Sequence, residues 1–381
     1  MSIYFDNAAT SSPKPPEVVD EVRRALTEYN ANPGRSGHAR ALAAARIVYD
    51  CRSALSDFLG AEPDDCIALG YSCTDALNLA IKGVLRRGDH VISTMLEHNS
   101  VLRPLNQLSV RREIALTLIA PRADGMVHPE DVRRALKRNT ALIAVTHASN
   151  VTGAIQPVAA IAQIARAAGV RCLIDGAQAL GALPVDVHRL DCDLYAFPGH
   201  KSLLGPQGTG GLYIRSGLSL NTVREGGTGT DSQSMLQSID PPERYESGTL
   251  NLPGLAGLLR GVEYVAAHRA AILSHERELT TALYEGLSKM EGAEIYTPRE
   301  EAARAALVSF NLGDLSSSDV ADGLSRRGIA VRGGLHCAPG THRVLGTLER
   351  GAVRASLGHA NSFEEVEEFL AALRDILKNG E

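Results

Sequence analysis

The stretch that decides the fold is residues 171–205, RCLIDGAQALGALPVDVHRLDCDLYAFPGHKSLLG. It contains two short apolar runs, 171–175 and 193–197, of the kind that forms buried strands. Asp175 closes the first run, and Lys201 comes just after the second. Because ligands of α/β sheets collect at the carboxyl ends of the strands, we expect these two side chains to meet at one edge.

The same alternation of strand and helix extends through the first two thirds of the chain. Further strands are predicted near 66–71, 90–95, 114–120, 141–148 and 211–215, and helices near 74–86, 99–109, 129–137 and 157–168. Near-continuous apolar strands separated by helices are typical of a sheet that helices cover on both faces. We therefore predict an α/β fold whose large domain holds a mainly parallel seven-stranded sheet.

The last third of the chain predicts a smaller α+β domain. One long helix should run from Pro253 to about residue 290, followed by a strand near 306–311 and helices near 318–327 and 363–378. We place the large domain at residues 15–259. The small domain then comprises residues 1–14 and 260–381 and carries the loop around Cys337.

Length and composition are those of an ordinary globular enzyme. The chain has 381 residues, of which 44% are hydrophobic and 22% charged. Its formal net charge of −5 argues against nucleic acid or an anionic membrane as a partner. The start, MSIYFDNAAT, resembles no signal peptide, and no window approaches the ~18 apolar residues that a membrane span needs. We expect a cytoplasmic protein.

The six cysteines have no C-x-x-C pair, which argues against a zinc site or a disulfide framework. Most lie in or beside apolar runs, as small buried residues do. Cys337 differs, because RGGLHCAPG surrounds it with glycines and a proline and predicts an exposed loop. Arg332 and His336 stand beside it as positive neighbours, which would favour the nucleophilic thiolate. A buried structural thiol is the alternative.

Polar residues also follow the other predicted strands. Asn150 follows 141–148, His98 follows 90–95, and the SCTD turn with Cys73 and Thr74 follows 66–71. Each signal is weak alone, since a strand-end Asp often caps a helix and a Lys among glycines is usually solvated. Together they supply a lysine for a Schiff base, an aspartate for a pyridinium nitrogen and a helix N-terminus for a phosphate. Pyridoxal phosphate requires these groups.

Several motifs carry a resemblance to a known family over nearly the whole chain. They are YFDNAATSSPKP, EHNSV, SNVTGAIQPV, IDGAQALGALPVDV, DLYAFPGHKSLLGPQGTGGLY, ESGTLN, RGGLHCAP and VRASLGHANSFEEVEEF. The chain resembles the class V aminotransferases, which are fold-type I pyridoxal-phosphate enzymes. Within that group it is most similar to cysteine desulfurases and selenocysteine lyases.

The resemblance implies a role for each matching residue. Lys201 would hold the cofactor covalently and move the substrate Cα proton, Asp175 would pair with the pyridine nitrogen, and His98 would stack on the ring. The other cofactor contacts implied are Gln178 and Asn150 at the ring oxygen and Thr74, Cys73, His200 and, from a neighbouring subunit, Thr249 at the phosphate. The substrate contacts implied are Arg354 at the carboxylate, with Arg332 and Asn7 nearby.

The implied reaction converts L-cysteine to L-alanine and leaves the sulfur on Cys337 as a persulfide. The sulfur would then pass to an acceptor protein or a small thiol, as in iron–sulfur cluster assembly, and the enzyme would be a homodimer. Two positions depart from the family pattern, Pro198 where serine is frequent and Cys73 where threonine is common. Arg354 follows Cys337 by 17 positions, which suggests a short, ordered cysteine loop.

Other functions stay open at this point. The pocket could serve a selenocysteine lyase, or a class V aminotransferase or β-lyase that does not use Cys337 as a nucleophile. A binding module without catalysis is a third possibility. The intact set of Lys201, Asp175 and His98 speaks against it.

Overall fold

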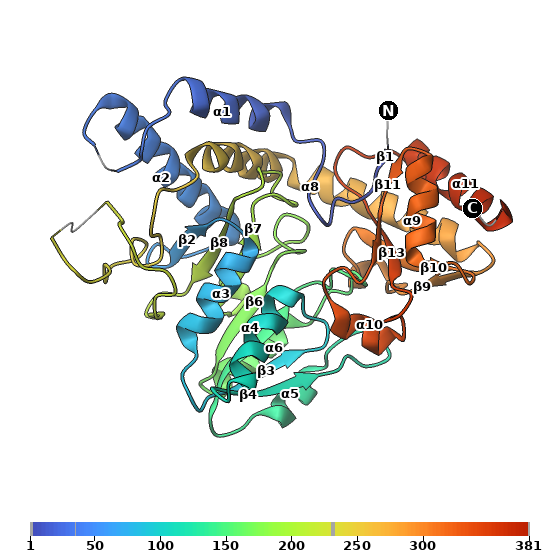
Figure 1. The fold of residues 1–381 in the computed structure, drawn as a ribbon, viewed down its shortest axis with the longest axis horizontal. Coiled ribbons are helices and arrows are strands. Elements are labelled where there is room, and N and C mark those ends of the chain that lie inside the picture. Colours follow the sequence, from blue (N-terminus) through green and yellow to red (C-terminus); the bar gives the residue numbers. More distant parts are fainter. Residues whose placement is uncertain (1–2, 35, 230–232, 380–381) are drawn as a thin grey trace.

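The computed structural model describes residues 3–34, 36–229 and 233–379. Its larger sheet has seven strands in the order β2-β8-β7-β6-β5-β3-β4 (Figure 1). The strands are β2 (Cys66–Gly70), β3 (His90–Thr94), β4 (Ala115–Ile119), β5 (Thr140–Thr146), β6 (Arg171–Asp175), β7 (Leu194–Pro198) and β8 (Gly210–Ile214). Strands β4, β3, β5, β6 and β7 pair in parallel, and β8 is antiparallel to both of its neighbours. The predicted mainly parallel sheet is confirmed.

Helices cover both faces of this sheet because the strand residues that point to either face are apolar. Cys172 and Ile174 of β6 pack into one core with the helices of one face, and Leu173 packs into the other core. The first face carries α2 (Ala39–Leu59), α5 (Pro129–Ala135), α6 (Val158–Ala167) and the first half of α8 (Leu252–Ser288). The second face carries α3 (Cys73–Val84) and α4 (Asn99–Val110).

A second, smaller sheet forms from the end of the chain. It is antiparallel, with the order β12-β13-β10-β9. The elements of this region are β9 (Ala293–Ile295), η1 (Glu301–Ala303), β10 (Leu307–Leu312), α9 (Ser317–Arg326), β11 (Ile329–Ala330), β12 (Arg332–Gly334), α10 (Pro339–Leu345), β13 (Ala352–Ser356) and α11 (Phe363–Asn379). The N-terminal strand β1 (Ile3–Tyr4) pairs in parallel with β11, and the two form a separate two-stranded sheet. The proposed domain limits at 15 and 259 stay a prediction.

Helix α8 connects the two regions and contributes to both cores. Its 37 residues make it about 55 Å long, and Figure 1 shows it running from the large sheet to the small one. Leu255 and Val262 pack under the large sheet, whereas Leu279 and Leu283 pack with Phe310 of the small one. One continuous helix therefore sets the distance between the two cores.

Three helical features differ from the sequence-based expectation. Helices α1 (Pro16–Thr27) and α2 were not predicted. Helix α1 buries only a narrow stripe against α8 and leaves most of its side chains in water. Helix α6 begins at Val158, so Pro157 precedes the helix instead of opening it. The short α7 (Val187–Leu190) lies in the link between β6 and β7.

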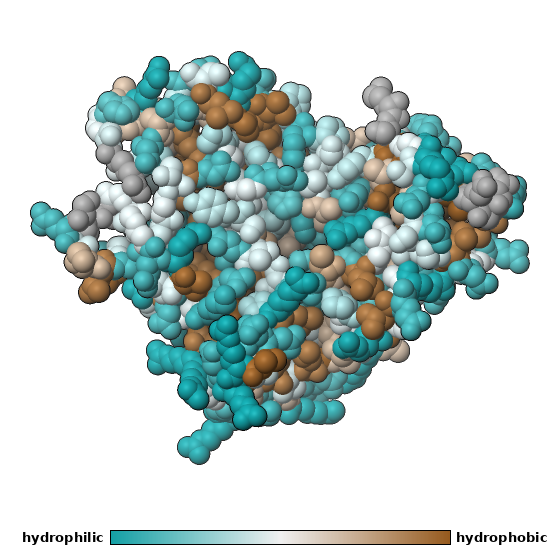
Figure 2. All heavy atoms as spheres, in the orientation of Figure 1, coloured by the Kyte–Doolittle hydropathy of each residue, from teal (hydrophilic) through white to brown (hydrophobic). Residues whose placement is uncertain are grey.

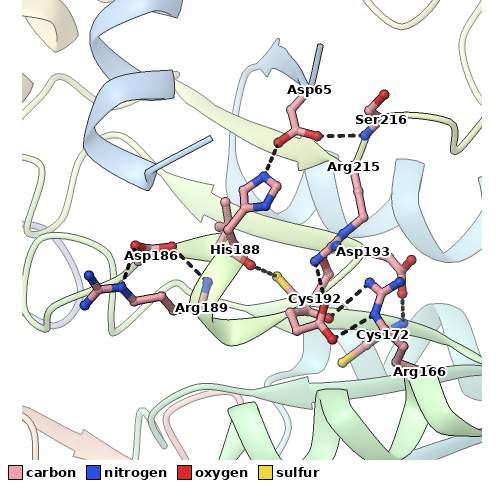
Figure 3. Close-up of polar contacts among 12 residues, drawn as sticks. Asp65, Arg166, Cys172, Asp186, His188, Arg189, Cys192, Asp193, Arg215 and Ser216 are labelled. Carbon is pink, nitrogen blue, oxygen red and sulfur yellow. Dashed lines mark hydrogen bonds and ion pairs between the residues drawn. The ribbon is translucent and has the colours of Figure 1, made fainter. Parts of the chain in front are cut away.

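A polar network fastens the edge of the sheet where β6 and β7 begin (Figure 3). Asp193 accepts hydrogen bonds from the Cys172 N–H at 2.9 Å and from Arg171 at 3.0 Å. Asp65 accepts from His188 at 2.7 Å and from the Ser216 N–H at 2.7 Å. These bonds hold the amino ends of the strands, so the opposite, carboxyl ends are left free for a binding site.

Of the helices in the described ranges, none combines the length and the apolar character that crossing a membrane requires.

Gly261 lets α8 approach the segment that follows Lys201. An added Cβ there would overlap the Leu203 carbonyl oxygen and lie 2.9 Å from the Gly205 nitrogen. Alanine normally stabilises a helix interior by about 1 kcal/mol relative to glycine, but here we expect Gly261→Ala to lower the free energy of unfolding by roughly 2 kcal/mol. Urea denaturation measures this difference.

Gly286→Ala in the same helix is the matched control. Its Cβ would meet the end of the Leu370 side chain, which can move. We expect a smaller loss there, and a Gly261→Ala protein at least as stable as the wild type would contradict the packing argument.

Candidate active site

The carboxyl ends of β2, β3, β5, β6 and β7 surround a cavity of about 160 Å³. It brings together eight residues that the sequence analysis selected from distant motifs. They are Cys73, Thr74, His98, Asn150, Asp175, Gln178, His200 and Lys201. Their position follows from the parallel strands, because each side chain lies at or just after the end of its strand.

Asp175 is the buried acid of this cavity, with 4% of its surface exposed. Its Oδ1 accepts from the Ala177 N–H at 2.9 Å and from the Cys73 thiol at 3.5 Å. Burial, reinforced by the Asp175 charge, raises the pKa of Cys73 well above its usual value, so this cysteine is a neutral thiol. Cys73 is therefore a hydrogen-bond donor to the acid and no nucleophile.

Lys201 carries the amine of the site. Burial lowers the pKa of its ammonium group, although Cys73 and Asp175 oppose that shift. Within the described ranges, the amine forms no hydrogen bond to another side chain or to the backbone, so it remains free to react. A buried lysine with a lowered pKa is the form that attacks carbonyl carbons.

His98 is the N-cap residue of α4. Its Nδ1 accepts from the Ser100 N–H at 3.0 Å, which places the proton of the neutral ring on Nε2. Burial lowers the pKa of His98, so the neutral ring is favoured. Ser100 also bonds Thr74 at 2.7 Å between their hydroxyl oxygens, and it thereby joins α3 to α4 at the cavity.

The residues expected at a phosphate lie at the start of α3. Ser72 caps this helix by accepting from the Asp75 N–H, and the N–H groups of the first turn have no partner inside the helix. The Nδ1 atom of His200 is buried and has no hydrogen-bond partner in the described structure. Burial lowers the pKa of His200 to about 4, so its ring is neutral.

Cys337 lies in a tight turn between β12 and α10. His336 and Cys337 both adopt left-handed backbone angles, with φ of 49° and 58°. The turn is fastened to the cavity, because the Cys337 carbonyl accepts from the Asn99 N–H at 2.7 Å and the His336 carbonyl accepts from Asn150 Nδ2 at 2.6 Å. The Cys337 side chain is exposed, as expected.

The neighbours of Cys337 correct one part of the sequence analysis. Arg332 does face the thiol, with Nη2 3.6 Å from Sγ. His336, expected as a second positive neighbour, is 2% exposed and points away to the Ala352 carbonyl at 3.0 Å. Burial lowers the pKa of His336 to about 2, so the ring is neutral and gives the thiol no positive charge. Arg332 supplies a positive charge in contact with the thiol, and the buried Arg354 adds a second one that acts on it electrostatically.

Arg354 is almost fully buried and already has partners. Its Nη2 pairs with Asp6 at 2.9 Å and its Nη1 donates to the Asn150 carbonyl at 2.9 Å, whereas its buried Nε has no partner in the described structure. The predicted carboxylate contact would therefore have to compete with Asp6. This acid was not selected from the sequence, because nothing local to residue 6 indicates a contact with residue 354.

The remaining predicted residues lie outside the cavity. Asn7 uses its amide group for Tyr4, Ser12, Ser356 and Asn361, which favours a structural role. Thr249 is exposed, and its carbonyl accepts from the Tyr71 hydroxyl at 2.9 Å. The roles expected of these two residues stay predictions.

Glu97 is a buried acid that the sequence analysis missed. It is 0% exposed, and its Oε1 accepts from Thr94 at 2.7 Å and from the Thr146 N–H at 3.0 Å. Burial, with a further contribution from the Asp175 charge, raises the pKa of Glu97 to about 8. The carboxyl group is therefore protonated at neutral pH.

These groups fit pyridoxal phosphate. Lys201 offers a free amine, Asp175 a buried carboxylate, and His200 a buried ring nitrogen without a partner beside the free N–H groups of α3. An anion at that helix start would find both hydrogen-bond donors and a favourable helix dipole. Within the described residues, no group of three His, Cys, Asp or Glu side chains could hold a metal ion.

Comparison with known proteins shows the family to which the chain belongs. Residues 3–369 match the sequence model of the family called Aminotransferase class-V. A probable cysteine desulfurase of Pyrococcus abyssi is 35% identical over 390 residues, which cover 99% of this chain and 94% of the relative. A probable cysteine desulfurase of Methanothermobacter thermautotrophicus is 34% identical, with coverage of 99% and 95%.

Solved structures give the same result. The structure of a cysteine desulfurase from Thermococcus onnurineus has a TM-score of 0.93 and 35% identity, and the match covers 99% of this chain and 95% of that one. A cysteine desulfurase of Escherichia coli, with its cysteine as the S-sulfonic acid, has a TM-score of 0.87 at 27% identity and covers 99% and 95%. The expected fold of fold-type I pyridoxal-phosphate enzymes is confirmed.

Glu97 makes stability depend on pH in a defined direction. The folded state keeps the proton up to about pH 8, whereas the unfolded chain loses it near the ordinary glutamate value of 4.5. The unfolded state therefore binds fewer protons between these values, and the contribution of Glu97 to stability falls as pH rises. The free energy of unfolding of Glu97→Gln, relative to that of the wild type, should therefore rise by about 1 kcal/mol per pH unit from pH 5.5 to 7.5. Urea denaturation of both proteins at each pH measures this difference, and a difference that does not change with pH would contradict the prediction.

Proposed function

We propose that this chain, which belongs to the aminotransferase class-V family, is a pyridoxal-phosphate-dependent cysteine desulfurase. It would convert L-cysteine to L-alanine and leave the sulfur on Cys337. The observation that carries the proposal is the turn at Cys337, which presents an exposed thiol and is fastened to the cavity through Asn99 and Asn150. A thiol that served only packing would not need this exposed position.

The cofactor, when bound, withdraws electrons from the substrate carbons. Lys201 would attach it, Asp175 would hold its ring nitrogen, and Gln178 and Asn150 would lie at its ring oxygen. Thr74 and His200 would bind its phosphate. Since Gln178 Nε2 donates to the Ala8 carbonyl at 3.0 Å and Asn150 Nδ2 to the His336 carbonyl, each amide keeps its oxygen for another donor.

Proton transfer falls to Lys201 and His98. The lowered pKa of Lys201 gives it a neutral amine at a higher proportion than an exposed lysine has, so it can take the Cα proton of the substrate. His98 presents its Nε2–H, because Nδ1 is held by the Ser100 N–H. Glu97 stays neutral beneath them and does not add a second negative charge beside Asp175.

Sulfur transfer falls to Cys337. Its thiolate would form an S–S bond with the substrate sulfur while the Cβ–S bond of the substrate breaks, and the electron pair of that bond stays on the carbon skeleton. The skeleton takes up protons and leaves as L-alanine, so L-cysteine and a protein thiol give L-alanine and a protein persulfide. Arg332, 3.6 Å from Sγ, would stabilise the negative sulfur.

The substrate carboxylate would bind Arg354. A carboxylate matches the guanidinium in charge and shape, and Asp6 occupies part of that position in the present structure. We therefore propose that substrate and Asp6 exchange on Arg354. Because Arg354 also bonds the Asn150 carbonyl, the same residue keeps the substrate pocket and the cofactor pocket in register.

A homodimer completes the proposal. Large apolar side chains are exposed on α1 and α2 and in the segment before α8, and Figure 2 shows apolar groups at the surface over α1. They include Val19, Leu26, Leu42, Tyr49, Met235, Leu236 and Ile239. A second subunit covering them would bring Thr249 to the phosphate of its neighbour. The persulfide sulfur would pass to an acceptor protein or a small thiol.

The cofactor assignment is tested by borohydride reduction, which fixes the cofactor to the lysine that holds it. We expect the tag on the peptide that contains Lys201 and its loss in Lys201→Arg. Lys14→Arg is the matched control, because Lys14 lies beside the site, donates to the His200 carbonyl at 2.8 Å and also has a lowered pKa, about 8. Peptide mass spectrometry decides, and a tag on Lys14 or any other lysine would refute the assignment.

The role of Cys337 is tested by supplying L-cysteine and measuring alanine and sulfide. Cys337→Ala should keep the spectral change of substrate binding but lose desulfuration by a factor of about 10² or more. Cys66→Ala, at a half-buried cysteine remote from the cavity, should retain full activity. Near-normal sulfide release by Cys337→Ala would replace the proposal with a β-lyase. If L-selenocysteine is supplied in a parallel assay, selenide release that survives in Cys337→Ala while sulfide release from L-cysteine is lost would favour a selenocysteine lyase.

A further inference from the structure

Glu276 is a buried acid that the proposed reaction does not use. It lies in the second half of α8 and is 8% exposed. Within the described ranges, its carboxyl group forms no hydrogen bond and no ion pair, whereas its backbone carbonyl also accepts from the Thr280 hydroxyl. Buried acids are normally paired, so an unpaired one needs an explanation.

The acid faces the largest cavity described in the molecule. This cavity, of about 470 Å³, lies between the link that follows β6, the second half of α8 and the segment that precedes β10. Apolar residues form most of its wall, among them Ile155, Leu183, Pro184, Leu273 and Ala305. The size and the wall are those of a site for a small organic molecule.

The other charged groups around the cavity have partners of their own, although the buried Nε of Arg304 has none in the described structure. Arg277 pairs with Glu301 at 2.9 Å at the exposed rim. Arg304 donates to the Arg299 carbonyl and the Thr281 hydroxyl at 2.9 Å and lies over the Tyr284 ring. Arg269 donates to the Leu183 carbonyl at 3.1 Å. Glu276 is the acid of the wall whose carboxyl group has no partner among the described residues.

The two histidines nearest to this acid do not compensate it. His359 shares a small adjoining cavity with Glu276, and burial lowers its pKa, so it is neutral. The ring of His275 bonds the Asn361 carbonyl at 2.8 Å. Burial is the single cause that raises the pKa of Glu276 to about 8, which agrees with the absence of a nearby positive charge among the described residues.

We propose that this cavity binds a small organic cation with an apolar body, whose positive group pairs with Glu276. The charge of the acid selects an ammonium group, and the apolar wall selects the hydrocarbon part of the ligand. Binding requires the ionised carboxylate, so a permanent cation expels the proton from Glu276. Affinity therefore rises with pH up to about pH 8, by about tenfold per unit.

The probe for this site is benzyltrimethylammonium chloride. It keeps its charge at every pH and, unlike a primary amine, cannot react with a carbonyl group. Calorimetric titration of the purified full-length protein at pH 6.5, 7.5 and 8.5 and constant ionic strength should give a Kd that falls about tenfold over the first step and less over the second. At pH 6.5, binding should also release close to one proton, which titrations in buffers of different ionisation enthalpy measure.

Three variants at the same cavity test separately the charge of Glu276, the charge at the rim and the space for the ligand. Glu276→Gln keeps the shape and should lose the binding, the pH dependence and the proton release. Glu301→Gln, at the paired acid of the rim, should bind within about threefold of the wild type. Ala182→Leu fills the cavity while keeping the carboxyl group and should also abolish binding, so the site can be tested even if Glu276→Gln folds poorly.

The proposal is overturned by any of three results. The first is a wild-type Kd above about 10 mM at pH 8.5. The second is binding that Glu276→Gln or Ala182→Leu retains, and the third is an affinity that does not change with pH.

Discussion

Parallel pairing of β5, β6 and β7 is the constraint on which the rest of the structure depends. Leu142 to Thr146 pair in register with Arg171 to Asp175, and Leu173 to Asp175 pair with Leu194 to Ala196. This register places the carboxyl ends of all three strands along one edge of the sheet. The residues that follow the strands therefore lie close together at that edge. Asp193 and Asp65 hold the opposite edge, so the strands cannot slip without breaking these hydrogen bonds, of which the one to Asp193 is buried.

The sequence could predict what depends on local pattern and on this edge. The seven strands, the long helix and the meeting of Asp175 with Lys201 follow from apolar periodicity and from the rule for parallel sheets. The pairing of Arg354 with Asp6 could not be predicted, because it joins residues 348 positions apart across two sheets. The neutral state of His336 is a second example. Whether a histidine beside a cysteine is charged depends on burial, and no residue near position 336 indicates that burial.

The cavity and the cysteine turn are built from different parts of the chain and are joined by few contacts. Asn150 is central, because its amide nitrogen holds the His336 carbonyl while its own carbonyl accepts from Arg354. Three elements of the proposed reaction, the cofactor pocket, the thiol and the carboxylate site, therefore meet at one asparagine. Two buried acids lie in the same region: Asp175 lines the cavity, and Glu97, whose pKa burial raises to about 8, is neutral.

The left-handed turn at His336 and Cys337 also limits how sulfur could leave. Both carbonyls of the turn are bound to the large domain, and α10 begins two residues later, so the thiol stands on a short, fixed support. A turn held by these bonds would not move away from the cavity to deliver sulfur. If Cys337 carries sulfur as proposed, the acceptor would have to approach this fixed thiol, either as a small molecule that diffuses to it or as a protein whose own thiol lies on a projecting segment.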